Sequence, residues 1–156
     1  MKSVYLDPSV PSACHERAQP ERRKITRRWW EEKIHRYRVL VSSLTMEEIE
    51  ALETREKREA ILSLICDFPL IEITPSAERL AKSYIHQRII PLNALNDALH
   101  ISLVATHNID ILLSWNFAHL VKPQVERKIN AFNLISGYPR IRIASPKDLM
   151  EEEFSS

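Results

Sequence analysis

The stretch KSVYLDPS, residues 2–9, decides the fold of this 156-residue chain. Its apolar run VYL (4–6) is short and rich in large side chains, as is typical of a strand buried in a parallel sheet. Asp7 ends the run, and Pro8 follows at a position that suits the first turn of a helix. The stretch therefore predicts a buried strand that leads, through an acidic residue, directly into a helix.

Further strand-like runs follow, with helical patterns between them. The runs are VLVSS (39–43), LIEIT (70–74), DILLSW (110–115) and RIRIA (140–144). Apolar residues at helical spacing predict helices within 61–68, 77–85, 95–107 and 117–136, the third buried and the last interrupted at Pro123. Strands that alternate with helices indicate parallel pairing. We therefore expect an α/β fold, a three-layer α/β/α sandwich around a central, mostly parallel sheet of about five strands.

Length and composition predict one globular domain. The chain is 44% hydrophobic and 28% charged, and we expect a single domain over residues 1–150 followed by an acidic tail at 151–156. No apolar run approaches the roughly 20 residues that span a bilayer, and the N-terminus has no apolar core of a signal peptide. We expect a cytoplasmic protein with no membrane partner. Cys14 and Cys66 have no metal-type spacing and are expected to be packed or inert thiols.

Four polar side chains stand at predicted helix starts: Asp7, Glu48, Asp97 and Asn116. Each has a structural explanation, because Asp7 and Asn116 suit N-caps, Glu48 suits a capping box with Thr45, and Asp97 suits the positive end of the helix dipole. Capping alone, however, does not require helix starts to converge. Parallel strands would bring at least three of these residues to one edge of the sheet, where ligands bind in such folds.

Carboxylates gathered at one edge repel each other unless a cation neutralises them. Three carboxylates and one amide supply hard oxygen ligands, which match Mg²⁺ or Mn²⁺ rather than zinc. A metal of this kind indicates phosphate chemistry. The only glycine is Gly137, which excludes a glycine-rich phosphate loop.

The motifs around these residues resemble those of the PIN domain family, and most closely its VapC-type toxins of bacterial type II toxin–antitoxin systems. The resemblance covers nearly the whole chain and rests on LDPSV (6–10), SSLTMEEIEAL (42–52), NDALHISLVATH (96–107) and DILLSWNFAHL (110–120). It implies a metal-dependent endoribonuclease that hydrolyses RNA phosphodiester bonds. It also implies a homodimer and an antitoxin protein as partners.

The resemblance assigns roles to particular residues. Asp7, Glu48 and Asp97 match the family's acids, which bind one or two Mg²⁺ or Mn²⁺ ions and activate water. Asn116 stands where the family often has a fourth acid, and a neutral amide is a weaker ligand for a second ion. These four are the expected catalytic residues. Ser9 and Asn116 are also expected to hydrogen-bond groups around the metal ligands.

Basic and aromatic residues suggest where RNA would lie. Between His15 and Arg38, nine Lys and Arg stand against four Glu, a stretch that either contacts phosphates or forms a solvated helix face. We assign Arg22, Arg23, Arg27 and His119 as RNA contacts. Trp29 and Trp30 are expected to anchor a helix rather than to stack on bases. His100, on the predicted 95–107 helix, is expected in the core or beside a metal ligand.

Other functions meet specific obstacles. A receiver domain needs an acidic pair after its first strand, where Asp7 stands alone, and a haloacid-dehalogenase-type phosphatase needs a second Asp where Ser9 stands. The main alternative is a PIN-fold binding or scaffold protein that has lost catalysis. Asn116 supports that alternative, and the three retained acids oppose it.

Overall fold

One parallel sheet organises the computed structural model, which describes residues 1–152. The strands lie in the order β3-β2-β1-β4-β5, and every neighbouring pair is parallel. The strands are β1 (Ser3–Leu6), β2 (Arg38–Ser42), β3 (Leu70–Ile71), β4 (Ile111–Leu113) and β5 (Arg142–Ala144). The predicted α/β fold and its five strands are confirmed, and the sheet is wholly rather than mostly parallel.

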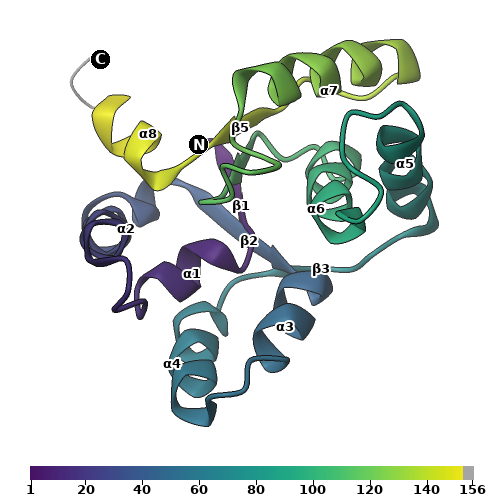
Figure 1. The fold of residues 1–156 in the computed structure, drawn as a ribbon. Helices are drawn as coiled ribbons and strands as arrows, with labels where there is room; N and C mark the ends of the chain where they lie inside the picture. The colour runs from purple at the N-terminus through teal and green to yellow at the C-terminus, as the bar shows by residue number, and fades with distance from the viewer. Residues whose placement is uncertain (153–156) are drawn as a thin grey trace.

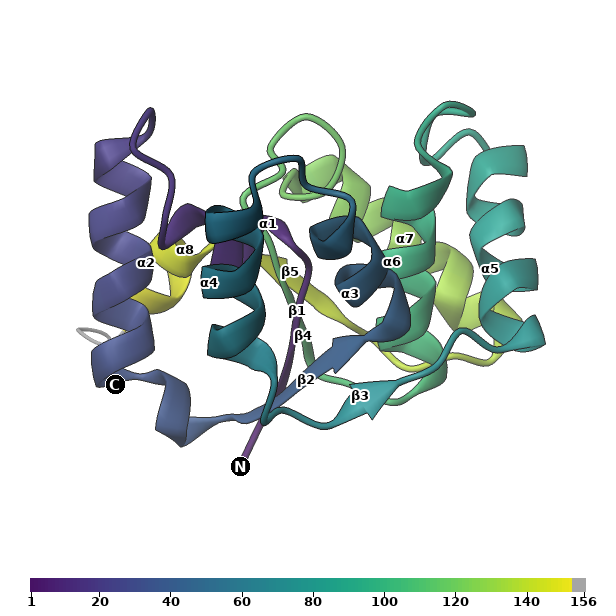
Figure 2. The same cartoon turned by 90° about the horizontal axis from the view of Figure 1, so that it is seen from below.

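Helices connect successive strands and cover both faces of the sheet (Figures 1 and 2). The helices are α1 (Ser9–Ala13), α2 (Pro20–Glu32), α3 (Ser43–Glu50), α4 (Arg55–Ile65), α5 (Pro75–His86), α6 (Leu95–Thr106), α7 (Pro123–Ser136) and α8 (Pro146–Glu151), with a short 3₁₀ helix, η1 (Ile34–Arg36), before β2. Helices α1, α2, α4 and α8 lie on one side, and α5, α6 and α7 lie on the other. No helix in the described part of the chain is both long and apolar enough to cross a membrane.

Alternation along the central strands divides the core into two clusters. Tyr5 of β1 packs with α5, α6 and α7, whereas its neighbours Val4 and Leu6 pack with α1, α2 and α4. Successive side chains of a strand point to opposite faces, so one strand supplies both cores. All three side chains are fully buried, which explains why β1 reads as a continuous apolar run.

The two tryptophans anchor helix α2, as expected. Trp29 is fully buried and packs edge-on against Trp30, with ring centroids 6.0 Å apart. Trp30 in turn lies 6.0 Å from the ring of Phe68, and Trp29 lies 6.0 Å from the ring of Tyr37. Their contacts hold α2 on the sheet while the charged side chains of the helix face outward.

Two expected elements differ from the sequence prediction. The helix or helix pair expected over 117–136 is interrupted at Pro123 as predicted, but only the part from Pro123 onward is helical, and residues 117–120 form turns. Proline lacks the N–H and the space that a continuing helix requires. The strand expected over 70–74 contains only Leu70–Ile71, since β3 is an edge strand and pairs only with the end of β2.

Smaller expectations have mixed outcomes. Thr74 caps α5 by accepting a hydrogen bond from the backbone N–H of Ala77. Cys14 is buried, and burial raises the pKa of its thiol to about 11, but Cys66 is exposed rather than packed. The expected acidic tail at 151–156 begins inside α8, and its residues 153–156 lie outside the described residues.

One buried hydrogen bond joins two helices of the α5–α7 layer and yields a prediction. Tyr84 donates its hydroxyl proton to Oδ1 of Asn133 at 2.6 Å, and both residues are fully buried. The side-chain nitrogen of Asn133 has no hydrogen-bond partner within residues 1–152, so the bond from Tyr84 is the one hydrogen bond of this buried side chain among them. Tyr84→Phe therefore leaves a buried amide unsatisfied and should lower the free energy of unfolding by about 1–3 kcal/mol.

Urea unfolding measures that change. Tyr138→Phe is the matched control, because it removes a hydroxyl that has no hydrogen-bond partner among the described residues, and it should change stability little. Equal stability losses in the two variants would show that the Tyr84–Asn133 bond does not stabilise the fold.

Candidate active site

The strand order places a site where β1 and β4 lie side by side. From β1 the chain moves outward through β2 and β3, and then returns to the other side of β1 with β4 and β5. Such a reversal of strand order opens a crevice at the carboxyl ends of the two neighbouring strands. Asp7 directly follows β1, and Ser114 directly follows β4. The two ends are joined by a backbone bond of 3.4 Å from the N–H of Asp7 to the carbonyl of Leu113.

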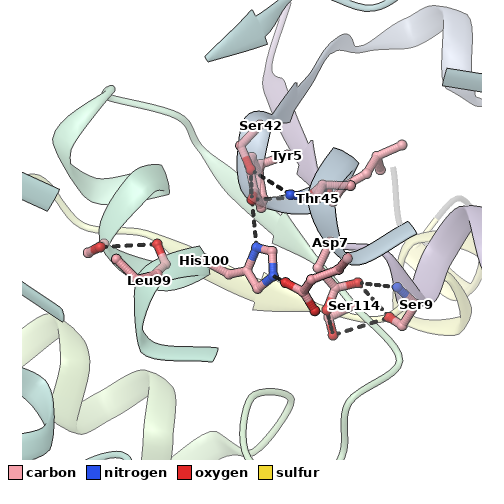
Figure 3. A network of polar contacts seen from close by, with 11 residues as sticks. Tyr5, Asp7, Ser9, Ser42, Thr45, Leu99, His100 and Ser114 are labelled. Atoms are coloured by element: carbon pink, nitrogen blue, oxygen red, sulfur yellow. Dashed lines mark hydrogen bonds and ion pairs between the residues drawn. The ribbon is translucent and has the colours of Figure 1, made fainter. Parts of the chain in front are cut away.

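Two serine hydroxyls hold the Asp7 carboxylate (Figure 3). The hydroxyl of Ser9 donates to Oδ1 at 2.5 Å, and the hydroxyl of Ser114 donates to Oδ2 at 2.5 Å. The backbone N–H of Ser9 also donates to Oδ1, at 3.0 Å. Each serine oxygen accepts a backbone N–H in turn, Ser9 from Trp115 at 2.8 Å and Ser114 from Asn116 at 2.9 Å. The carboxylate is therefore fixed by both strand ends.

Asp7 is a buried acid without a Lys or Arg partner in the described part of the chain. Its exposed fraction is 4%, and no Lys or Arg within the described residues forms an ion pair with it. Burial raises the pKa of this carboxyl, and His100, Ser114 and Ser9 oppose that rise. Burying a carboxylate without a counter-charge is costly, so the site favours a bound cation.

Glu48 is positioned by a histidine rather than by its own helix. Its Oε1 lies 2.7 Å from Nε2 of His100 on α6, and the other ring nitrogen of His100 lies 2.6 Å from the hydroxyl of Tyr5. The capping box predicted between Glu48 and Thr45 is wrong, because Ser42 caps α3 by accepting the backbone N–H of Thr45 at 3.1 Å. Glu48 is thereby turned toward the edge of the sheet that carries Asp7.

Tyr5 connects the Glu48–His100 pair to the central strand of the sheet, β1. Its hydroxyl also lies 2.7 Å from Oγ of Ser42 and 3.2 Å from Oγ1 of Thr45, which donates to the carbonyl of Leu6 at 3.1 Å. Burial raises the pKa of Tyr5, and the negative charges of Asp7 and Glu48 raise it further, so the hydroxyl keeps its proton. Since both nitrogens of the imidazole are bonded, the ring between Tyr5 and Glu48 has one orientation (Figure 3).

The third acid, Asp97, also faces a histidine. Asp97 lies in the first turn of α6, one turn before His100, and its Oδ2 lies 2.9 Å from Nδ1 of His119. Asn116 accepts the backbone N–H of His119 through its Oδ1 at 2.9 Å. Asn116 therefore caps a turn rather than a helix, and this turn holds His119 over Asp97.

The donor chemistry fits a hard divalent cation, although the acids are not gathered as a metal cage. Within residues 1–152, no three His, Cys, Asp or Glu side chains form a group that could hold a metal ion. The side chains of Glu48 and Asp97 are partly exposed, at 32% and 23%, and each uses one oxygen to contact a histidine. Their other oxygens, Oε2 and Oδ1, have no hydrogen-bond partner in the described part of the chain. Carboxylate oxygens of this kind suit Mg²⁺ or Mn²⁺.

Of the basic residues assigned to RNA, two lie beside the site. The guanidinium of Arg22 stacks over the rings of Trp115 and Phe117, 5.2 Å from each centroid, and Arg22 lines a pocket that begins at Ser9. His119 is at the site because of its contact with Asp97. Arg23 and Arg27 instead line a separate pocket beyond α1.

A match to a protein-family model shows which family this chain belongs to. The model described as PIN domain matches residues 4–116, a segment that contains Asp7, Glu48, Asp97 and Asn116. The chain is a member of the PIN domain family. A search of curated proteins finds no match.

Three solved bacterial structures illustrate the fold that this PIN domain shares with known proteins. Mycobacterium tuberculosis VapC20, a toxin that cleaves the sarcin-ricin loop, has a TM-score of 0.60 at 15% identity, with 90% of this chain and 99% of that chain covered. DNA-bound VapBC from Salmonella typhimurium has a TM-score of 0.56 at 13% identity, covering 94% and 99%. VapBC2 from Rickettsia felis, bound to a promoter DNA fragment, has a TM-score of 0.53 at 10% identity, covering 91% and 97%.

Three residues of this PIN domain site were not predicted from the sequence. Ser114 donates to Asp7, Tyr5 orients His100, and Thr45 supports Tyr5. Ser114 could have been found, because a serine that ends an apolar run beside an acid at the next strand end is a candidate hydrogen-bond partner. Tyr5 reads as an ordinary core residue, and only the position of α6 reveals its role.

The buried carboxylate of Asp7 yields a prediction about stability. Because burial raises the pKa of Asp7 in the folded state, its ionised form disfavours folding above that pKa, and this cost disappears as the pH falls through the folded pKa. In EDTA at neutral pH, Asp7→Asn should therefore unfold at a higher temperature than the unsubstituted protein. The difference should shrink as the pH is lowered toward the ordinary pKa of an aspartate.

Thermal unfolding followed by circular dichroism over this pH range measures the effect. Asp110→Asn is the control, because hydrogen bonds from Ser3 lower the pKa of Asp110 and its removal should destabilise the fold. An Asp7→Asn variant that is less stable than the unsubstituted protein at neutral pH would contradict the prediction.

Proposed function

We propose that this protein is a metal-dependent endoribonuclease that hydrolyses RNA phosphodiester bonds, and that it is the toxin of a type II toxin–antitoxin pair. One observation carries the proposal: the buried Asp7 carboxylate, at the point of a PIN fold where strand order reverses, forms no ion pair with a Lys or Arg among residues 1–152. Glu48 and Asp97, from α3 and α6, supply further carboxylates toward the same edge.

Asp7, Glu48 and Asp97 would hold one or two Mg²⁺ or Mn²⁺ ions. When bound, such an ion polarises a phosphoryl oxygen and lowers the pKa of a water for in-line attack. Ser9 and Ser114 keep the Asp7 carboxylate oriented, and their hydrogen bonds favour its ionised form. His100 fixes Glu48 from the interior of the protein.

Asn116 and His119 act at the rim of the site. The amide oxygen of Asn116 holds the backbone of His119, and the imidazole of His119 contacts Asp97. We assign Asn116 to orientation of a water or of the scissile phosphate, with the Asn116 turn setting the position of His119. Since an amide carries no charge, this arrangement favours one metal ion over two.

Partners follow from the fold neighbours as part of the same proposal. One neighbour is a toxin that cleaves the sarcin-ricin loop, and two are VapBC proteins crystallised with DNA. We propose that this protein acts on RNA in the cytoplasm and forms a homodimer. We also propose that an antitoxin protein binds it. Arg22, whose guanidinium stacks over the rings of Trp115 and Phe117 and which lines the same pocket as Ser9, would contact the RNA strand.

A catalytically inactive binding protein is the second candidate. It is favoured by the neutral Asn116 and by the histidine contacts that occupy one oxygen each of Glu48 and Asp97. It leaves unexplained why a buried, unneutralised Asp7 is retained, because a carboxylate without a cation destabilises the fold.

RNA cleavage separates the two candidates. Purified protein should cleave a mixed RNA pool with Mg²⁺ or Mn²⁺ and not with EDTA, and Asp97→Asn should reduce the rate at least about 100-fold, since it removes a metal ligand. Asp67→Asn is the matched control, because Asp67 is exposed and precedes β3 at the opposite end of the sheet. Folded protein without antitoxin that cleaves nothing in either metal would favour the binding protein.

Asn116→Asp tests the assignment of Asn116. An aspartate can still accept the N–H of His119 and adds a charged oxygen ligand, so Mn²⁺ should bind about tenfold more tightly. Calorimetric titration with Mn²⁺ measures the affinity, with Asn93→Asp, on the exposed loop before α6, as the control. A fall in affinity would remove Asn116 from the site.

A further inference from the structure

A basic pocket lies beyond the site, between α2 and α4. Residues from the α1–α2 loop, from α2 and from the start of α4 line it. Its charged and titratable lining residues are Arg17, Arg23, Arg27, Lys57, Glu56 and His15. Four cations thus face one carboxylate, and Ala60 is the only apolar side chain in the lining.

The arginines of this basic pocket are available to a ligand. In the described part of the chain, Arg17, Arg23 and Arg27 form no ion pair with a carboxylate. Arg27 donates its Nε to the carbonyl of Cys14 at 2.7 Å, which fixes the guanidinium and leaves its terminal nitrogens unused. Lys57 is the exception, since it pairs with Glu16 at 2.9 Å.

His15 adds an unsatisfied polar group to the same pocket. Its Nε2 is buried and has no hydrogen-bond partner among residues 1–152. Burial lowers the pKa of His15, and the positive charges of Arg27 and Lys57 lower it further. The field inside the pocket is therefore positive, and a buried ring nitrogen there lacks the partner that an anion would supply.

The basic pocket opens on the same edge of the molecule as the active site. Figure 2 shows the first turns of α2 and α4 at the edge that also carries α1 and the loop after β4. A second pocket lies between the two places, because Ser9 in its lining bonds Asp7 and Glu16 in its lining pairs with Lys57 of the basic pocket. Its other lining residues are Ser12, Ala13, Ala18, Gln19 and Arg22. Polar and basic groups thus extend from Asp7 over α1 toward α2.

We propose that the pocket formed by Arg17, Arg23, Arg27 and His15 binds a backbone phosphate of the RNA strand, beside the nucleotides that occupy the active site. The proposal rests on the proposed nuclease function for the identity of the polyanion. Planar guanidinium groups match phosphate oxygens in pairs, which suits three arginines facing one pocket.

The lining favours a nucleic acid backbone over an acidic protein segment. A protein partner would need apolar or aromatic anchors at the centre of its interface, and this pocket offers only Ala60. A phosphate backbone needs no such anchor, because its affinity comes largely from contacts with Lys and Arg. The pocket would therefore add affinity for RNA without specifying its bases.

Two adjacent residues of α2 provide a matched test. Arg23 lines the basic pocket, whereas Lys24 is exposed and lines neither this pocket nor the one around Arg22, so Arg23→Glu and Lys24→Glu make the same change in net charge at different places. Binding of a labelled, mixed-sequence single-stranded RNA is measured in EDTA, by fluorescence anisotropy over a range of salt concentrations. Circular dichroism confirms that both variants are folded.

Arg23→Glu should weaken RNA binding about tenfold and reduce the slope of log affinity against log salt by about 0.7 for each phosphate that the variant no longer neutralises. Lys24→Glu should leave both quantities nearly unchanged. Equal decreases in affinity in the two variants, no decrease in either, or no RNA binding by the unsubstituted protein would overturn the proposal. A glutamate-rich peptide serves as a second probe. If the unsubstituted protein binds this peptide, and Arg23→Glu abolishes peptide binding but keeps its RNA affinity, the pocket binds a protein partner and the proposal is overturned.

The test is independent of catalysis, because EDTA removes the metal. If the unsubstituted protein binds RNA and only Arg23→Glu weakens it, the pocket is supported even where no cleavage is seen. If cleavage depends on Mg²⁺ or Mn²⁺ while Arg23→Glu binds RNA normally, the pocket is wrong and the nuclease function stands. In an active enzyme, Arg23→Glu should raise KM and leave kcat within about twofold.

Discussion

The burial of one carboxylate at the junction of two parallel strands is the constraint on which the rest of this site depends. Asp7 is almost without exposure, and it is held by serines that follow β1 and β4. Both serines also bond backbone amides after β4, so the same contacts that orient the acid join the two halves of the sheet. This buried acid forms no ion pair with a Lys or Arg among residues 1–152, so a bound cation would offset the cost of its charge.

Histidines set the positions of the other two acids. His100 links Glu48 to the hydroxyl of Tyr5 in the centre of the sheet, and His119 meets Asp97 from the loop after β4. Each imidazole contacts one oxygen of its acid, and the other carboxylate oxygen has no hydrogen-bond partner within residues 1–152. The arrangement shows how three carboxylates can approach one edge of a sheet without a bound ion.

The fold was largely predictable because its information is local. Five short apolar runs separated by helical patterns sufficed for a parallel α/β sheet, and the matched family and fold neighbours agree with it. The errors fell where nonlocal pairing or proline decides the outcome. The edge strand β3 pairs only over Leu70–Ile71, and α7 cannot begin before Pro123. Glu48 looked like a capping residue because the sequence contains no sign that His100 lies opposite it.

The sequence by itself determined which chemical groups stand at strand ends and helix starts, since these follow from the order of residues along one segment. The sequence could therefore predict that Asp7, Glu48, Asp97 and Asn116 are candidate site residues, but it could not predict the contacts that they make. Only the tertiary structure decided that Ser114 shares the carboxylate of Asp7, that Tyr5 directs His100, and that Arg23 and Arg27 face a pocket apart from Arg22. The physical reason is that hydrogen bonds and pockets join residues about a hundred positions apart, as Ser114 and Asp7 are, and such pairs meet only when the sheet and its helices are packed.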